Sequence, residues 1–289
     1  MQSTVLQDLL AFTDYLRQSG HLDVSFSALD PVFAPYYPIL CQYEIHTNPY
    51  CAYLKSQPLS FQRCIAQKNK VRKQCAAELC YGCCYAGVEE YRMGVFAEET
   101  CIAQIHVSGY RGRLPEALAK RTHLAQMLPH AVYETLTARY QSALTDQIPP
   151  AQTVQAAITP LGYLFEKLYA QAKTESVYGG RKGELYRAAI AYLCDHYGEP
   201  LTQAQMARAL YVSESYLHHT FTELAGQTPQ AYLMALRIRQ SKHLLCYSRA
   251  TITEIALACG FSDANYFSSV FHKKTGKTPS AYRKAHPDV

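Results

Sequence analysis

Residues 260–284 read GFSDANYFSSVFHKKTGKTPSAYRK, and this stretch ends on a phrase that the chain also carries fifty residues earlier. GQTPQAY occupies residues 226–232, and GKTPSAY occupies residues 276–282. At this offset, the 17 residues that start at 216 share seven identities with their counterparts, where unrelated segments would share about one. The C-terminal region is therefore predicted to contain two copies of one structural unit.

Each copy carries the local signals of a helix, a tight turn and a second helix. The first helix begins with a capping box, T-x-x-Q at Thr202 and T-x-x-E at Thr251. In the second copy it is expected to end at Gly260, a residue suited to the left-handed conformation. Ser213 or Ser262 is then placed to cap the second helix. The pattern predicts two helix-turn-helix units, with ordinary helical hairpins as the alternative.

The positive charge of the chain is concentrated in the same region. Residues 181–289 contain 13 Lys and Arg against 8 Asp and Glu, whereas the first 180 residues contain 15 of each. A surface of this sign attracts phosphate backbones regardless of their sequence. Residues 231–248 lack Gly and Pro and predict one continuous helix that separates the two units.

Residues 185–285 resemble the C-terminal DNA-binding domain of AraC/XylS-type transcription regulators. The matching phrases are MARALYVSESYLHHTF, LRIRQSKHLL and ITEIALACGFSDANYFSSVFHKKTGKTPSAYRK. The resemblance implies an all-α domain, residues 181–289, with two helix-turn-helix units joined by a long helix and reading successive major grooves. This chain departs from the family at Tyr211, where glycine is frequent, and at Ser269, where arginine is frequent.

The polar faces of the two second helices are the candidate DNA-reading surfaces. The predicted contact residues are Ser215, His218, His219 and Thr222 in the first unit, and Asn265, Ser268, Ser269 and His272 in the second. Lys273 and Lys274 are expected to hold phosphates. A solvated helix face has the same polarity, so the resemblance, more than the pattern, favours DNA. The paired histidines predict that the first unit carries more of the sequence preference.

Residues 1–115 are predicted to form an α/β sensory domain. Short strands are expected at 41–45, 94–98 and 101–109, and a helix at 60–79. The phrases NPYC, RC and CYAGV, which begin at residues 48, 63 and 84, resemble the PocR sensory domain, a proposed PAS-like ligand-binding module. The resemblance implies a pocket for a small diol-like or carbonyl metabolite. Tyr85 departs from the family, which usually has histidine there.

Eight of the 11 cysteines lie in this N-terminal region. Cys75, Cys80 and Cys83 have the spacing of three plant-type iron–sulfur ligands, and Cys80 with Cys83 also suits zinc. A fourth ligand would come from Cys64, Cys84 or Cys101. Free cysteine also packs as a small buried hydrophobe, so a metal or cluster site and packed thiols remain alternatives.

Residues 116–178 are predicted to connect the two domains through two helices broken at Pro149-Pro150. Leu161, Leu164, Phe165 and Leu168 form an apolar stripe that fits either core packing or a dimerising helix pair. Gly179-Gly180 then marks the boundary of the DNA-binding domain.

The sequence as a whole favours a transcription regulator that binds double-stranded DNA as a homodimer and responds to a small-molecule effector. The alternatives are a redox-sensing or metal-sensing regulator and an Ada-type DNA repair methyl acceptor. No Ser/His/Asp order, phosphate-binding glycine loop or paired-carboxylate motif favours an enzyme. Since the sequence shows neither a signal peptide nor a long apolar stretch, a cytoplasmic protein without a membrane partner is expected.

Overall fold

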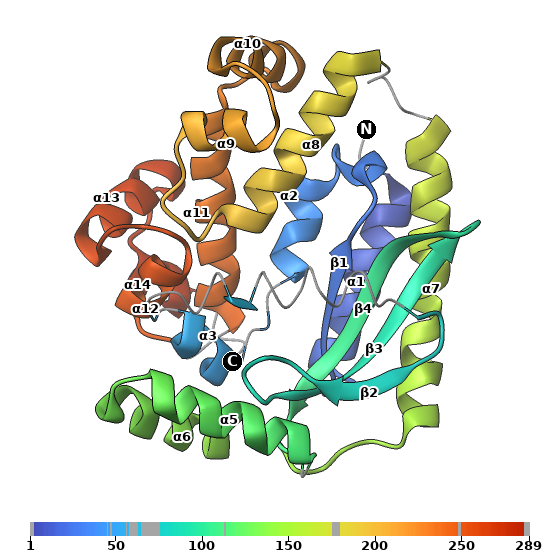
Figure 1. Ribbon diagram of the computed structural model, residues 1–289, viewed down its shortest axis with the longest axis vertical. Helices are drawn as coiled ribbons and strands as arrows, with labels where there is room; N and C mark the ends of the chain where they lie inside the picture. The colour runs from blue at the N-terminus through green and yellow to red at the C-terminus, as the bar shows by residue number, and fades with distance from the viewer. Residues whose placement is uncertain are drawn as a thin grey trace. The chain divides into compact units, whose positions relative to one another are not determined.

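The computed structural model describes residues 3–44, 46, 48–55, 57, 63–64, 76–112, 114–174, 180–247 and 250–285. The chain forms two compact units (Figure 1). The N-terminal unit comprises Met1–Asp30, Tyr43–Cys51 and Ala66–Thr174, and the C-terminal unit comprises Pro31–Gln42, Ala52–Ile65 and Glu175–Val289. No helix among the described residues is long and apolar enough to cross a membrane.

The N-terminal unit is built on an antiparallel sheet of four strands in the order β1-β4-β3-β2. The strands are β1 (Asp23–Ala28), β2 (Cys80–Cys83), β3 (Glu89–Ala97) and β4 (Thr100–Tyr110). The strands predicted at 94–98 and 101–109 are confirmed within β3 and β4, which turn at Glu98, a residue with φ of 57°. The strand predicted at 41–45 is wrong, because Cys41–Tyr43 forms a 3-10 turn, η2.

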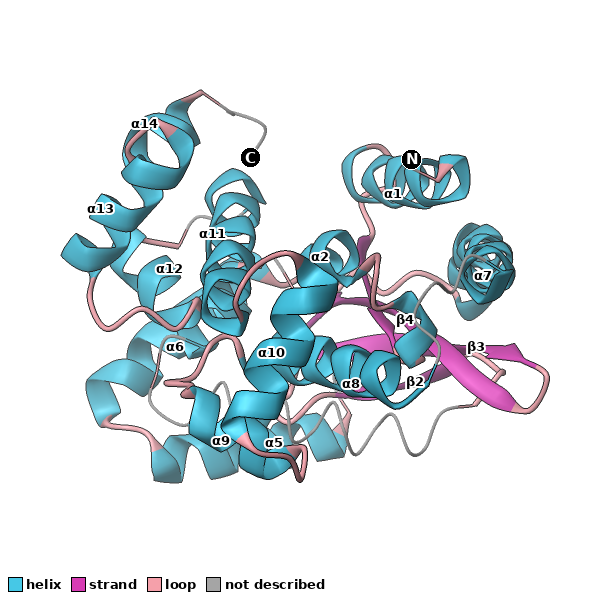
Figure 2. Ribbon diagram, turned by 90° about the horizontal axis from the view of Figure 1, so that it is seen from above, coloured by secondary structure: helices cyan, strands magenta, loops and turns pink. Residues whose placement is uncertain are grey.

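Two helices cover the apolar face of this sheet, α1 (Thr4–Gln18) and α7 (Ala151–Thr174), which lie side by side in Figures 1 and 2. Phe165 of α7 meets Phe26 of β1 edge-on, with ring centroids 4.9 Å apart. Leu161, Phe165 and Leu168 are fully buried, so the predicted apolar stripe supplies core packing. Leu164 is only half-buried and lies toward the surface.

The connector contains three helices rather than the predicted two. The helices α5 (Pro115–Met127) and α6 (His130–Ala143) are separated at Leu128-Pro129, and α7 begins directly after Pro149-Pro150. Pro160 lies inside α7 without ending it. The helix predicted at 60–79 lies largely outside the described residues, of which 63–64 are helical and 76–79 are not.

The C-terminal unit is helical, as predicted. Its helices are α8 (Gly180–His196), α9 (Gln203–Ala209), α10 (Glu214–Ala225), α11 (Pro229–Tyr247), α12 (Ile252–Ala258), α13 (Ala264–Thr275) and α14 (Pro279–Lys284). The long helix α11 contacts α10, α12 and α14, so it joins the pair α9/α10 to the pair α12/α13. Leu217, Phe221, Phe267 and Phe271 are fully buried beneath the second helix of each pair.

The predicted caps explain where these helices begin. Thr202 and Thr251 both form complete capping boxes, and Ser213 caps α10 by accepting from the backbone N–H of Tyr216. Ser262 does not cap α13. Asp263 does, accepting from two backbone N–H groups, while the Ser262 hydroxyl donates to the Asp263 carboxylate over 3.1 Å. An ionised carboxylate competes better than a hydroxyl for the positive end of a helix.

A segment from the first quarter of the chain packs within the C-terminal unit. The turn η1 (Pro31–Phe33) and the short helix α2 (Tyr37–Leu40) both contact α8, and Phe33 and Leu40 are fully buried. The chain continues through α3 (Pro49–Lys55). The core of the C-terminal unit therefore includes side chains that local sequence patterns in residues 181–289 do not reveal.

Candidate nucleic-acid interface

The second helix of the first pair, α10, presents a polar face that is mostly open. Ser215, His218 and His219 are exposed, whereas Thr222 is half-buried. His218 is held by its neighbour in α9, because its Nδ1 lies 3.2 Å from Oε1 of Gln203. The amide of Gln203 also donates to the backbone oxygen of Glu214, over 3.2 Å. The first helix pair thus positions the imidazole of His218, whereas the next residue, His219, is exposed.

The second pair presents the corresponding face on α13. Asn265, Ser269 and His272 are exposed, and so are Lys273 and Lys274 in the last turn. Ser268 is half-buried, and its hydroxyl donates to the carbonyl of Ala264 over 2.7 Å. A hydroxyl engaged by its own helix is less suited to reading a base edge.

An ion pair lies at the edge of the polar face of α10. The Lys182 ammonium lies 2.7 Å from a carboxylate oxygen of Glu223, and the His219 imidazole lies 3.9 Å from the same oxygen. The hydrogen bond from Lys182 holds the pKa of Glu223 below its usual range. The carboxylate is therefore paired with the Lys182 ammonium, which reduces its repulsion of a phosphate near His219.

Two residues of this region were not predicted as part of the site. Gln203 of α9 contacts His218 of α10. The only sequence signal for this contact is the position of Gln203 at the start of α9. Tyr211 lies in the turn between α9 and α10, is 96% exposed and has φ of 56°. The equivalent residue of the second pair is Gly260, with φ of 80°. Both turns therefore use the left-handed conformation that glycine adopts most easily.

The candidate metal ligands are only partly described. Cys75 lies outside the described residues. Cys80 is exposed and Cys83 is buried on β2, and burial raises the pKa of the Cys83 thiol despite Lys120 Nζ at 3.4 Å from its sulfur. Cys84 follows at the end of that strand. Within the described part of the chain, no group of three His, Cys, Asp or Glu side chains is arranged to hold a metal ion.

Comparison with known families adds one decisive observation. The family model described as a helix-turn-helix domain matches residues 206–285, from within α9 to the residue after α14. Residues 206–285 are a helix-turn-helix domain. The matched range contains α10, α11, α12 and α13 completely, and with them every predicted DNA-contact residue.

Similarity to individual proteins covers less than half of the chain. The chain is 38% identical over 95 residues to the HTH-type transcriptional activator RhaS of Shigella boydii, covering 33% of this chain and 34% of that protein. It is 34% identical over 126 residues to the uncharacterized HTH-type transcriptional regulator YijO of Escherichia coli, covering 44% and 43%. The chain thus aligns with less than half the length of these curated relatives.

Among solved structures, about a third of this chain is similar to each of two domains. The C-terminal domain of AraT, a response regulator from Geobacillus stearothermophilus, is 30% identical, with 37% of this chain and 88% of that chain covered and a TM-score of 0.36. The DNA-binding domain of AdpA, solved in complex with a target DNA, is 28% identical, with 35% and 90% covered and a TM-score of 0.34.

Proposed function

We propose that this protein is a sequence-specific DNA-binding transcription regulator of the AraC/XylS type. The observation that supports the proposal is the two capped helix pairs, α9/α10 and α12/α13, whose second helices present open polar faces within the matched domain. The N-terminal unit would bind a small-molecule effector and change how the DNA-binding faces are presented, a coupling between two distinct sites. Redox sensing, metal sensing and methyl-acceptor repair have no corresponding support in the described thiols.

The proposed DNA contacts predict two different mutant phenotypes. His218→Ala should weaken binding to a selected operator about fivefold, because a base contact is lost, and should change binding to a scrambled duplex little. Lys274→Ala should weaken binding to both duplexes alike and reduce the salt dependence by about one counterion, because a phosphate contact is lost. Fluorescence anisotropy titrations at several salt concentrations measure both effects.

The pairing of the two variants makes the test discriminating. Loss of operator binding alone in Lys274→Ala would contradict the phosphate role. An equal loss on both duplexes in His218→Ala would contradict base reading by the first unit. Lys120→Ala, which changes a lysine of the N-terminal unit, is the charge-matched control and should change neither affinity.

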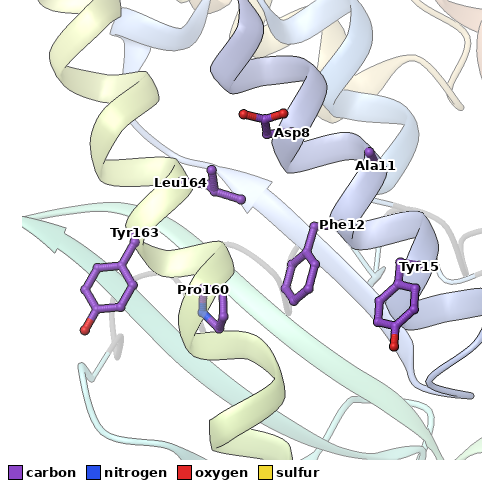
Figure 3. Close-up of a pocket in the computed structure, with 7 residues that line it drawn as sticks. All are labelled: Asp8, Ala11, Phe12, Tyr15, Pro160, Tyr163 and Leu164. Carbon is purple, nitrogen blue, oxygen red and sulfur yellow. The ribbon is translucent and has the colours of Figure 1, made fainter.

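We also propose that the protein acts as a homodimer through a surface on α1 and α7. An open groove of about 550 Å³ runs between these helices, and its lining residues are shown in Figure 3. Two tyrosines on this surface are largely exposed, Tyr15 at 58% and Tyr163 at 61%. The first 15 residues of α7, Ala151–Phe165, include no charged side chain. Depletion of charge together with exposed tyrosine is typical of interface cores.

The chemistry of the groove fits a second copy of the same chain. Pro160 has no N–H, so the carbonyl of Ala156 lacks its helical donor, and Asp8 adds a carboxylate acceptor. The hydroxyls of Tyr15 and Tyr163 are donors on the same surface. A surface that carries both partners of a hydrogen bond suits a two-fold interface, where each copy meets the other's equivalent groups. Only residues 175–179 separate α7 from α8, so the interface would keep two DNA-binding domains within reach of each other.

Tyr163→Lys is expected to raise the dimer dissociation constant about 30-fold, since an aromatic residue at an interface centre is worth about 2 kcal/mol. Sedimentation equilibrium of the full chain measures this constant. Leu118→Lys, at a 59% exposed apolar residue of α5, is the matched control and should leave the constant unchanged. A parent chain that remains monomeric at micromolar concentration would refute the interface.

A further inference from the structure

A small cavity lies between α5, α6 and the start of α3, within the N-terminal unit. Its volume is about 40 Å³. One ordered water needs about 10–15 Å³ of such space, so the cavity has room for about three or four non-hydrogen atoms. We call it the Arg121 cavity, and the described residues that line it are Tyr50, Arg121, Tyr133, Leu136, Thr137, Tyr140 and Gln141.

The cavity has a buried floor and an open mouth. Tyr50 and Tyr140 are buried, whereas Thr137 and Gln141 are exposed. The rings of Tyr50 and Tyr140 meet edge-on, with centroids 5.4 Å apart, and the Tyr50 hydroxyl donates to the carbonyl of Ala86 over 2.7 Å. A ligand can therefore enter past Thr137 and Gln141 without displacing the aromatic floor.

Arg121 is the one charged side chain among the described residues of the cavity wall, and it is held from two sides. The backbone of Gly87 lies against its aliphatic part, since a Cβ at Gly87 would lie 2.6 Å from Cγ of Arg121. The guanidinium lies over the Tyr140 ring, with its central carbon 4.2 Å from the ring centroid. The cation is therefore fixed beside the cavity before any ligand binds.

The charge of Arg121 is not balanced by an acid. Within the described part of the chain, no carboxylate forms an ion pair with Arg121, and its Nε is buried without a hydrogen-bond partner. The nearby buried acid Glu89 has other partners, because it accepts from the Tyr81 hydroxyl over 2.7 Å and from the backbone N–H of Leu114 over 2.9 Å. A half-buried cation without an acid favours an anion beside it.

The other polar groups of the cavity are available as donors. The side-chain oxygen of Gln141 accepts from a terminal nitrogen of Arg111 over 2.7 Å, which leaves the Gln141 amide nitrogen to donate. The hydroxyls of Tyr133 and Thr137 make no hydrogen bond with any residue that the structure describes. Burial raises the pKa of Tyr140 above its usual value, so its hydroxyl stays protonated. One cation surrounded by such donors suits a ligand group that only accepts.

We propose that the Arg121 cavity binds the carboxylate group of a small organic acid. A carboxylate is planar and only accepts hydrogen bonds, so it matches the planar guanidinium fork and the surrounding hydroxyl and amide donors. An acid of more than about four non-hydrogen atoms would extend through the mouth between Thr137 and Gln141. The inference rests on the proposed function only in taking this acid as the effector, because binding itself does not require DNA.

The first test uses acetate as the probe, with acetamide and sodium chloride as controls for charge and for anion type. Isothermal titration calorimetry of the full chain should give acetate a dissociation constant of about 0.1–5 mM, since a ligand of this size has few contacts. Acetamide should bind about tenfold more weakly or less, because it lacks the charge. No acetate binding up to about 20 mM, equal binding of acetamide, or displacement of acetate by equimolar chloride would overturn the proposal.

The second test changes the cavity wall. Arg121→Met keeps an apolar stem against Gly87 and removes the guanidinium, so acetate should bind about 20-fold more weakly. Tyr133→Phe removes one hydroxyl donor and should weaken acetate binding about threefold. Lys167→Met is the matched control, because it removes an exposed positive charge from α7 of the same unit, and it should bind acetate as the parent does.

Circular dichroism establishes that each variant is folded, and Tyr133→Phe alone decides the test if Arg121→Met is not. Unchanged acetate affinity in the folded cavity variants, or an equal loss in Lys167→Met, would overturn the proposal.

Operator binding separates this inference from the proposed function. Acetate should change the affinity of the parent for the selected operator and leave that of Arg121→Met unchanged, since Arg121 lies outside the helix-turn-helix domain. Acetate binding without any change in operator affinity would support the site and count against its role as the effector site. Normal operator binding by a parent that does not bind acetate would overturn the site while the DNA-binding function stands.

Discussion

Substituting Gly260 by alanine is expected to destabilise the C-terminal unit by about 3 kcal/mol or more. Gly260 has φ of 80°, a conformation that costs a residue with a Cβ about 1–2 kcal/mol. A Cβ would also collide with the carbonyl oxygen of Tyr197, and would lie 2.9 Å from a terminal nitrogen of Arg237 and 3.0 Å from the carbonyl carbon of Gly198. Backbone atoms on the opposite side cannot move away without disturbing the loop after α8.

Tyr211→Gly is the matched control and should act in the opposite direction. Tyr211 occupies the equivalent turn position, with φ of 56°, but its side chain is almost fully exposed. Glycine relieves the left-handed strain while making the unfolded chain more flexible, so a net gain of about 0.5–1 kcal/mol is expected. Native-state hydrogen exchange of the α10 and α13 amides measures both changes. If the two substitutions change the free energy of unfolding in the same direction and by the same amount, strain and crowding do not distinguish the two turns.

The second large effect is expected at Arg237, a buried residue of α11. Its Nε donates to the carbonyl of Tyr197 over 2.8 Å, one terminal nitrogen donates to the carbonyl of Glu199 over 2.6 Å, and its guanidinium lies over the ring of Phe261. Burial lowers the pKa of Arg237. Arg237→Leu would leave two carbonyls without their donors, so a loss of about 3–5 kcal/mol is expected.

Two further variants separate the hydrogen bonds of Arg237 from a general effect of removing a positive charge. Arg237→Lys should recover only part of the loss, because a single ammonium group does not reproduce the planar fork that meets both carbonyls. Arg208→Leu, at an exposed residue of α9, should cost less than about 0.5 kcal/mol. Hydrogen exchange of the same amides gives the comparison. Equal losses for Arg208→Leu and Arg237→Leu would exclude the proposed hydrogen bonds as the cause.

Local chemistry explains which parts of this fold could be predicted from sequence. Capping boxes involve residues three positions apart, so Thr202 and Thr251 predict two helix starts without any knowledge of the tertiary structure. The prediction that Ser262 caps α13 is wrong, because the neighbouring Asp263 carboxylate accepts from the first backbone N–H groups instead. Pro160 shows where local prediction fails. Proline usually ends a helix, but packing of α7 against the sheet keeps this helix continuous.

In the candidate site, too, local sequence patterns predicted some features and not others. Helical periodicity placed Ser215, His218 and Asn265 on exposed faces, but it did not reveal that Ser268 bonds its own helix. The contact between Gln203 and His218 joins two helices across space, and no pattern within either helix encodes it.

The packing of residues 31–42 on α8 has a consequence for the timing of biosynthesis. About 140 residues separate Leu40 from the first residue of α8, so a ribosome needs on the order of ten seconds to supply the partner of Phe33 and Leu40. During that interval, these apolar side chains have been synthesised but their final contacts do not exist. The C-terminal unit therefore finishes folding with a piece of chain that emerged long before it, and a nascent protein stalled before α8 would expose that segment to chaperones.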